Sequence, residues 1–300
     1  TSMTNTNHPP KKIYKYFKRS RQIFKNSQGQ ELNLLKLNNL FTDSIIHDFS
    51  NYYSSKIKDN VKKELNELVT KIDNKNNRLE LYFAQLSLHR LNSNDNNSYD
   101  VLEKLLKDVD KVSEENIWFK KRLKSEIIEE IIKILPAVKN PNRIKEIFEL
   151  GISLKREIDD QEGLCQLLIF KSDYLFNLGG DLDVIEKYYL EAESISKNIG
   201  SMDFASDSHS GLGKIYYKKK DYEKSLSQFS KACVESKIDD NIINQYVALI
   251  GIHKIITITK DKEIFIEFSD EVEHVISKDT VRGKDYSELN ELVNNIKDSL

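Results

Sequence analysis

The chain has 300 residues, of which 39% are apolar and 31% charged, so it can bury the core of one large domain or of two ordinary ones. Its 10 glycines and 4 prolines are too few for the many tight turns of a sandwich, a barrel or a doubly wound sheet. The composition therefore predicts an all-α fold with short loops, and no apolar run approaches the roughly 20 residues of a membrane span.

Cysteine usage and the N-terminus both favour a reducing compartment. The two cysteines, Cys165 and Cys233, cannot build a disulfide framework, and the first residues lack the apolar stretch of a secretory signal. We therefore expect a cytoplasmic protein, with no membrane partner.

The N-terminal 30 residues are strongly basic. They carry seven basic side chains and no acid, so the other 270 residues have a net charge of −9 within the total of −2. Such a segment favours contact with nucleic acid, because each phosphate that it pairs with releases a counterion. Two alternatives stay open. The basic side of an N-terminal helix interacts with the acidic remainder of the chain, or, less favoured, the basic segment contacts a membrane surface. The basic residues include Lys15, Lys18, Arg19 and Arg21.

After residue 60 the apolar residues recur with helical periodicity. The predicted helices are Val61–Ile72, Leu79–Leu91, Tyr99–Val112, Trp118–Leu135, Arg143–Ile158 and Gly163–Asn177. A polar Asn, Ser and Asp linker at 92–98 and the prolines Pro136 and Pro141 separate successive helices, because proline cannot continue a helix interior. We therefore divide the chain into an N-terminal helical effector region, 1–60, and a helical repeat domain, 61–300.

The strongest internal signal is a repeated helical hairpin. One stretch follows the order and spacing of a tetratricopeptide unit, with Leu212, Gly213, Tyr216, Ser225, Phe229 and Ala232 at the matching positions. One repeat upstream, Leu178-Gly179, Tyr189 and Ala192 echo that order with a short insertion. Ala192 and Ala232 lie 40 positions apart, which indicates a unit longer than the common one. The repeats are clearest at 163–237.

Units of this kind stack into a superhelix whose first helices line a concave groove. In the best unit, five residues would face that groove without being needed for packing between helices: Asp207, Ser210, Lys214, Tyr217 and Lys218. Their polar groups suit an extended peptide or protein segment, whose backbone requires hydrogen-bond partners. The alternative is a face that is only solvated.

The sequence offers no sign of catalytic chemistry. The six histidines are scattered without a metal-ligand spacing, and no glycine-rich loop that could cradle phosphates is present. Cys165 lies in an amphipathic helix, where a small core residue is a better interpretation than a nucleophile. We expect no enzyme, no metal and no cofactor.

At this point the chain resembles the peptide-pheromone receptors of the Rgg, PlcR and Rap group from low-GC Gram-positive bacteria. The resemblance implies a repeat array that binds a short signalling peptide and an N-terminal effector region. Residues 13–21 resemble the first helix of a helix-turn-helix and residues 41–49 its recognition helix, so Thr42, Ser44 and His47 become candidates for contact with DNA. Asp43 and Asp48 oppose that interpretation, since they place negative charge near phosphates.

The Rap branch implies the other interpretation, an adaptor that inhibits a response regulator and does not bind DNA. Residues 81–90 resemble a helix of its N-terminal bundle, whereas the glutamine required for phosphatase activity is replaced by Leu91. The sequence thus predicts a regulator that binds peptide and contacts DNA, with a protein-interaction adaptor as the alternative. A homodimer is compatible with the first interpretation, because members that read DNA recognise paired half-sites.

Overall fold

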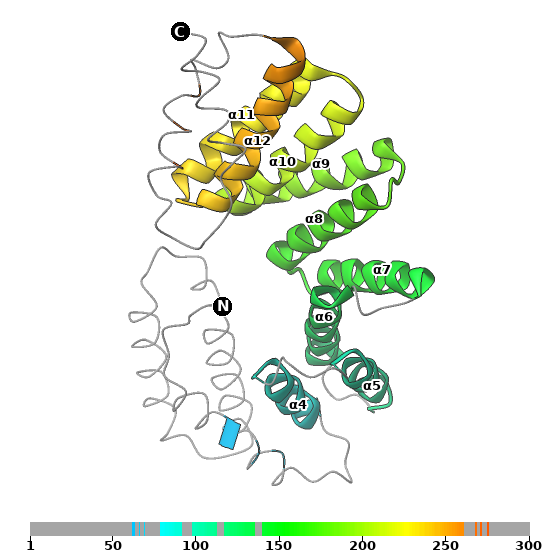
Figure 1. The fold of residues 1–300 in the computed structure, drawn as a ribbon. Helices are drawn as coiled ribbons and strands as arrows, with labels where there is room; N and C mark the ends of the chain where they lie inside the picture. Colours follow the sequence, from blue (N-terminus) through cyan, green and yellow to red (C-terminus); the bar gives the residue numbers. More distant parts are fainter. Residues whose placement is uncertain are drawn as a thin grey trace. The chain divides into compact units, whose positions relative to one another are not determined.

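The computed structural model describes residues 79–91, 98–112, 117–135 and 140–260, with a few single positions outside these ranges. Nine α-helices and no strand occur in this described part (Figure 1), which confirms the all-α prediction there. In chain order they are α4 (Leu79–Leu91), α5 (Ser98–Asp110), α6 (Ile117–Lys133), α7 (Pro141–Glu157), α8 (Gln161–Asn177), α9 (Leu182–Ile199), α10 (Met202–Lys218), α11 (Tyr222–Ile238) and α12 (Ile242–Thr259). The predicted effector region at 1–60, and the boundary at its end, lie outside the described residues.

The helix predictions from α4 to α8 agree with the observed bounds to within two residues at each end. Pro141 is the first residue of α7, the helical position where a missing backbone N–H costs nothing.

The described helices divide into two compact units after Leu154, within α7. In the first unit α4, α5 and α6 pack on one another around fully buried side chains such as Leu86, Leu102 and Ile127. Arg90, nearly buried at the end of α4, donates hydrogen bonds to Glu126 and Glu130 of α6 at 2.9 and 2.7 Å. This charged pairing ties α4 to α6 beside the apolar core.

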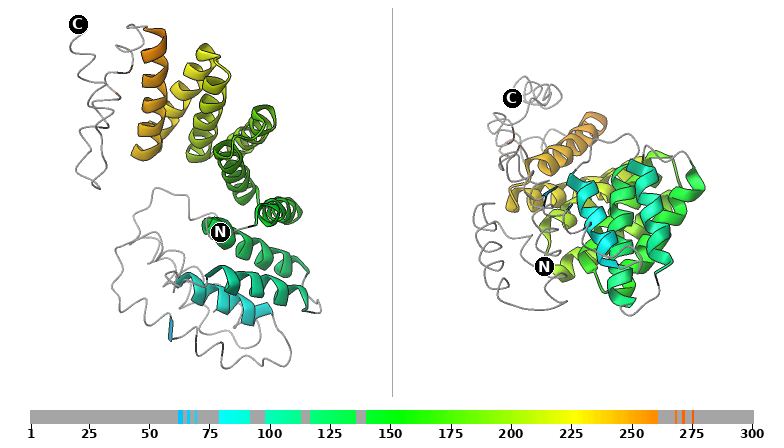
Figure 2. Two further views of the ribbon diagram at one scale, coloured as in Figure 1. Left: turned by 45° about the vertical axis from the view of Figure 1, so that its right-hand side comes forward. Right: turned by 90° about the horizontal axis from the view of Figure 1, so that it is seen from below.

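The second unit is a series of antiparallel helical hairpins. Each helix from α8 to α12 packs on the next, and α10 also contacts α8 and α12, two helices away in either direction. Figure 2 shows α10, α11 and α12 side by side. We call α8, α10 and α12 the A-helices and α9 and α11 the B-helices. The A-helices are therefore neighbours in one layer.

Three of the four turns between these helices, those after α9, α10 and α11, use the same local chemistry. After α10, Lys220 adopts a left-handed conformation (φ 62°), and the next N–H, of Asp221, donates to the carbonyl of Tyr216 at 3.0 Å. Asp221 is also the N-cap of α11, where its carboxylate accepts from the backbone N–H of Lys224 at 3.2 Å. This joins a Schellman motif directly to an N-cap, so a helix ends and the next begins within three residues. The turns after α9 and α11 repeat the arrangement.

The repeat length of 40 residues is confirmed by the B-helix N-caps, Asp181 and Asp221. The alignment of the upstream unit is wrong in one detail. Leu178-Gly179 does not occupy the Leu-Gly position of an A-helix but lies in the turn after α8, with Gly179 at φ 72°. The A-helix N-caps Asp160 and Ser201 are 41 positions apart, so Lys171 and Ser172 are the equivalents of Leu212 and Gly213. Leu178-Gly179 matched the Leu-Gly pair of the repeat pattern because glycine is also common at the end of a helix.

Glycines let an aromatic ring of each B-helix pack directly against the backbone of the following A-helix. A Cβ atom at Gly211 would collide with the Tyr189 ring, and one at Gly251 would lie 2.5 Å from the Phe229 ring. The two pairs are themselves 40 residues apart, so this close approach belongs to the repeat. Overpacking at such a contact typically costs 1–3 kcal/mol.

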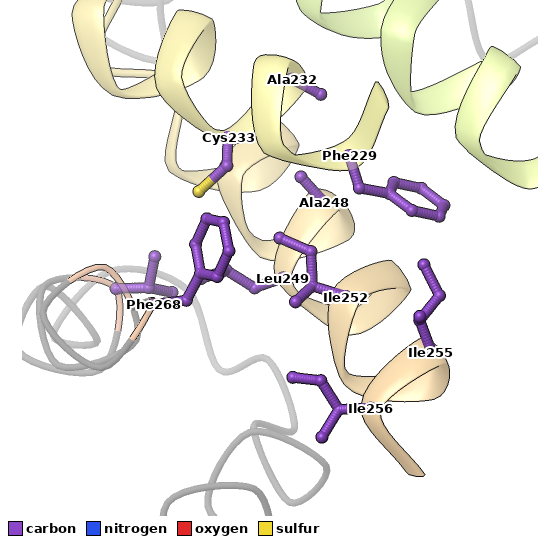
Figure 3. Packing of buried hydrophobic residues seen from close by; sticks show 10 residues of the cluster. Phe229, Ala232, Cys233, Ala248, Leu249, Ile252, Ile255, Ile256 and Phe268 are labelled. Carbon is purple, nitrogen blue, oxygen red and sulfur yellow. The ribbon is translucent and has the colours of Figure 1, made fainter. Parts of the chain in front are cut away.

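Helix α12 is long and apolar enough to cross a membrane, with a mean hydropathy of 1.3 over 18 residues, 39% of which are buried. One side of it forms a core with α11 (Figure 3), in which Leu249 and Ile252 of α12 and Phe229 and Cys233 of α11 are buried together with Phe268. The core helix of a soluble protein can meet the same criteria, and packing in the repeat array accounts for the buried apolar residues of α12, whereas Ile243 and Ile258 are exposed.

Candidate peptide-binding face

The five predicted groove residues all lie on α10, but they differ in exposure. Asp207 and Tyr217 are half-buried, Ser210 is 5% exposed, the Lys214 side chain is 40% exposed, and Lys218 is exposed. Asp207, Ser210 and Lys214 follow one another at spacings of three and four residues, so they share one face of the helix. We call the corresponding side of the three A-helices the A-face, defined by Asp173, Asp203, Asp207, Ser210, Lys214, Lys218 and Asn244.

Asn244 of α12 connects the A-face to Asp207. Its side-chain Nδ2 donates to Oδ1 of Asp207 at 2.8 Å and lies 3.4 Å from Oδ1 of Asp203. The N-cap residue Asn241 donates to the same oxygen of Asp203 at 2.6 Å. Two carboxylates of α10 are thus held by amide groups from the start of α12.

Asp173 of α8 completes the acidic part of the face. Its Oδ1 accepts a hydrogen bond of 2.7 Å from the Tyr189 hydroxyl and lies 3.9 Å from Nζ of Lys214. Tyr189 belongs to α9, and its ring passes α10 where Gly211 has no side chain. Burial, followed by the charges of Asp203 and Asp173, raises the pKa of Asp207 to about 7, although Asn244 and Lys214 act in the opposite direction.

Asp173 and Asn244 were not singled out in the sequence, and Tyr189 was singled out only as a position of the repeat. For Asp173 a signal existed, because the 41-residue offset between the N-caps of α8 and α10 pairs it with Lys214. The match at Leu178-Gly179 placed the Leu-Gly pair of the upstream unit seven positions too late and hid that equivalence. Asn244 carries no such signal, since its contact with Asp207 depends on how closely α10 and α12 approach.

Tyr217 is committed in part to packing. Its ring lies edge-on to that of Tyr222, with centroids 5.9 Å apart, and it borders the core of α11 and α12. Replacing it would therefore alter stability as well as any contact with a ligand, so Lys218 is the cleaner probe of this end of the A-face.

His209 fixes α10 between the two B-helices. Its Nδ1 lies 2.6 Å from Oε2 of Glu235 on α11, and its Nε2 lies 3.0 Å from Oε1 of Glu193 on α9. Since the imidazole is only 2% exposed, these contacts hold α10 between α9 and α11 inside the array.

Neither cysteine shows the features of a nucleophile. Both are buried, and burial raises the pKa of Cys165 and of Cys233 to about 12. The Cys165 thiol donates to the backbone carbonyl of Ala192 at 3.2 Å, which suits the predicted core role. Within the described ranges, no three His, Cys, Asp or Glu side chains gather as metal ligands.

The first unit contains an open pocket of about 580 Å³ between α5 and the start of α7. Leu106 and Leu150 contribute its apolar part. Arg143 crosses it and donates to both carboxylate oxygens of Glu103, at 2.8 and 3.1 Å, and to Glu146 at 3.1 Å. These bonds use the donors of the guanidinium, so we interpret Arg143 as a structural link between α5 and α7.

The candidate residues for contact with DNA lie outside the described residues. They are Lys15, Lys18, Arg19, Arg21, Thr42, Ser44 and His47.

The chain matches no known protein family and no curated protein sequence. Solved structures that resemble its fold include the following two. One is BtubC (BKLC) from P. vanneervenii, with a TM-score of 0.54 and 10% identity over 86% of this chain and 95% of that one. The other is a STAND protein (signal transduction ATPase with numerous domains) with a tetratricopeptide repeat sensor from Pyrococcus horikoshii, with a TM-score of 0.58 and 18% identity.

The fold is tetratricopeptide-like. The match to the STAND protein covers 96% of this chain but 46% of that one, so this chain spans about half its length. At these identities the likeness concerns the fold alone. It agrees with the consecutive helical hairpins of the second unit.

Proposed function

We propose that this chain is a binding protein whose A-face holds a short peptide or an extended segment of a partner protein. The observation that carries the proposal is the polar surface that α8, α10 and α12 build together, with Asp207 and Asn244 joined across two helices. An extended segment has backbone N–H and C=O groups that need partners, and the carboxylates, amides and ammonium groups here supply both kinds.

The test is selection of binders from a random heptapeptide library with the full chain, followed by measurement of the dissociation constant of one synthetic binder. Lys218→Glu, on the A-face, is expected to weaken binding about tenfold or more. Lys231→Glu makes the same change at an exposed position of the B-helix α11 and is expected to leave binding unchanged. Equal effects of both variants, or a library without binders, would contradict an A-face site.

The finer proposal is a cytoplasmic regulator of the Rgg, PlcR and Rap type, in which peptide binding repositions an N-terminal region that contacts DNA. The support is the resemblance of two N-terminal segments to a helix-turn-helix and the absence of acids among the first 30 residues. A ligand shifts such an equilibrium only if it binds the two states with different affinity. Two buried free cysteines are in keeping with a reducing compartment.

DNA contact predicts binding of a random-sequence duplex that weakens steeply with salt, and loss of that binding when Lys18, Arg19 and Arg21 are all changed to Glu. If the triple variant binds the duplex as the parent chain does, the adaptor alternative is favoured, in which the repeats bind protein and no DNA is contacted. In both cases we propose a binding role and no catalysis, in line with the inert surroundings of Cys165.

A further inference from the structure

The two turns that lead into α10 and α12 expose large apolar side chains. Ile199 and Met202, on either side of the turn after α9, are 38% and 42% exposed. Ile238 and Ile243, on either side of the turn after α11, are 64% and 44% exposed. Single exposed apolar residues are common, whereas several that adjoin one another mark sites of protein interaction. What these residues imply therefore depends on whether the two turns are neighbours.

Side-chain contacts join the two turns. Asn241, the N-cap of α12 in the second turn, donates through Nδ2 to Oδ1 of Asp203 at 2.6 Å, and Asp203 directly follows Met202. Burial, followed by the charge of the same Asp203, raises the pKa of Asp239, which precedes Asn241 by two residues. The two turns therefore lie side by side at one end of the array. We call their surface the turn surface, defined by Ile199, Met202, Asp203, Ile238, Asp239 and Ile243, with Asp203 shared with the A-face.

The lysines beside the two turns pair with carboxylates outside the turn surface. Nζ of Lys197 lies 2.5 Å from Oε1 of Glu193, and Nζ of Lys237 lies 2.9 Å from Oε1 of Glu271. The donors that meet Asp203 are instead neutral amides, at 2.6 and 3.4 Å. An amide does not cancel the charge of a carboxylate, so the turn surface keeps a negative potential around its apolar side chains. It therefore favours a partner that is cationic as well as apolar.

We propose that the turn surface docks an amphipathic basic segment of a partner protein. The apolar side chains of such a segment cover the exposed isoleucines and the methionine, and its lysine or arginine groups pair with Asp203 and Asp239. An anionic segment with the same apolar side chains is rejected, because it brings like charges together. This is a second binding surface, and it does not depend on peptide binding at the rest of the A-face.

Three peptides of about 14 residues, long enough to form a helix, test this chemistry with the full chain. The first combines leucine at helical spacing with lysine, the second has glutamate in place of lysine, and the third has serine in place of leucine. In a calorimetric titration at about 150 mM salt, we expect the leucine-lysine peptide to bind about tenfold or more tightly than either of the others. Equal affinity for the glutamate peptide or the serine peptide, or no binding of the leucine-lysine peptide, would overturn the proposal.

Ile238→Ser is expected to weaken binding of the leucine-lysine peptide about tenfold. The matched control is Leu178→Ser, since Leu178 is also 64% exposed but follows α8, at the opposite end of the helices. We expect this control to change the affinity less than about twofold. Both side chains are exposed, so both variants are expected to fold. Equal effects of the two variants would contradict binding at the turn surface.

The role of charge is tested at the two ends of α11. Asp239→Asn is expected to weaken the leucine-lysine peptide about threefold, because it removes one carboxylate of the turn surface. Glu223→Gln removes the same charge at an exposed position at the start of α11 and is expected to leave the affinity unchanged. Lys218→Glu, which tests the A-face, is not expected to weaken this peptide. Weakening by Lys218→Glu and not by Ile238→Ser would assign the peptide to the A-face and refute the turn surface.

Other occupants of the turn surface give distinct results. If a second copy of this chain covers it, light scattering shows a molar mass that rises with concentration and returns to that of the monomer in Ile238→Ser. If basic residues of the chain itself cover it, the leucine-lysine peptide binds only after Lys18, Arg19 and Arg21 are changed to Glu. Either result would overturn the assignment to a partner protein.

Discussion

At the scale of single residues, the surroundings of Asp207 disfavour the ionised form of its carboxyl group. The groups around it are Asp173 of α8, Asp203 and Lys214 of α10, and Asn244 of α12. Burial and the two neighbouring carboxylates raise its pKa from 3.8 to about 7. Between these values the folded chain keeps a proton on Asp207 that the unfolded chain has already lost. The contribution of Asp207 to stability therefore falls as the pH rises from about 4 to about 7.

Asp207→Asn is expected to remove this loss. The free energy of unfolding, measured by urea denaturation at pH 5 and pH 8, should favour the variant over the parent chain more at pH 8 than at pH 5. A fully buried group would give 1.36 kcal/mol for each unit of pKa difference, and for this half-buried side chain we expect a difference of ~1–2 kcal/mol between the two pH values. Glu223→Gln should show no such difference, and an equal effect of Asp207→Asn at both pH values would refute the assignment.

At the scale of helices and turns, the sequence predicts much of the second unit because its signals are local. Helical periodicity predicted α8. The 40-residue spacing reflects turns in which a left-handed residue is followed directly by an N-cap, as at Lys220 and Asp221. In the upstream unit only the Leu-Gly match was wrong, because a Leu-Gly pair occurs both where two helices cross and where a helix ends. The bonds of Asp207 to Asn244 and of Tyr189 to Asp173 join different helices, so no local pattern encodes them.

The turn after α10 offers a direct stability test. Lys220 has a left-handed backbone (φ 62°), which costs a residue with a side chain roughly 1–2 kcal/mol, and its own side chain is exposed. Lys220→Gly relieves that strain at the price of a more flexible unfolded chain, so we expect stabilisation of ~0.5–1 kcal/mol in urea denaturation.

Gly200, in the turn after α9, is the matched control of opposite sign. It has φ 70°, and nothing lies within 4 Å of where a Cβ would be placed, so Gly200→Ala introduces conformational strain and no clash. We expect it to destabilise the chain by ~1 kcal/mol. If both substitutions shift stability in the same direction, the left-handed turn is not what sets their effects.

At the scale of the whole molecule, the division after Leu154 implies that the two units respond separately to local damage. In a repeat array each hairpin depends chiefly on its neighbours, so a defect weakens the contiguous helices of its own unit first. Gly251→Ala forces a methyl group against the Phe229 ring and should destabilise α10 to α12 by ~1–3 kcal/mol. Alanine in place of glycine within a helix would otherwise stabilise it by about 1 kcal/mol, so the sign of the change identifies the clash.

Amide hydrogen exchange measured by mass spectrometry would show where each defect is felt. Gly251→Ala is expected to speed exchange in α10, α11 and α12 and to leave α4, α5 and α6 as slow as in the parent chain. Ile127→Ala leaves a cavity at a fully buried position of α6 and is expected to lower the free energy of unfolding by ~2–5 kcal/mol. It should speed exchange in α4, α5 and α6 and leave α10, α11 and α12 as slow as in the parent chain. Faster exchange in both units with either variant would mean that they unfold as one cooperative body. In that case a ligand on the A-face would stabilise α4 to α6 as strongly as the helices that it touches.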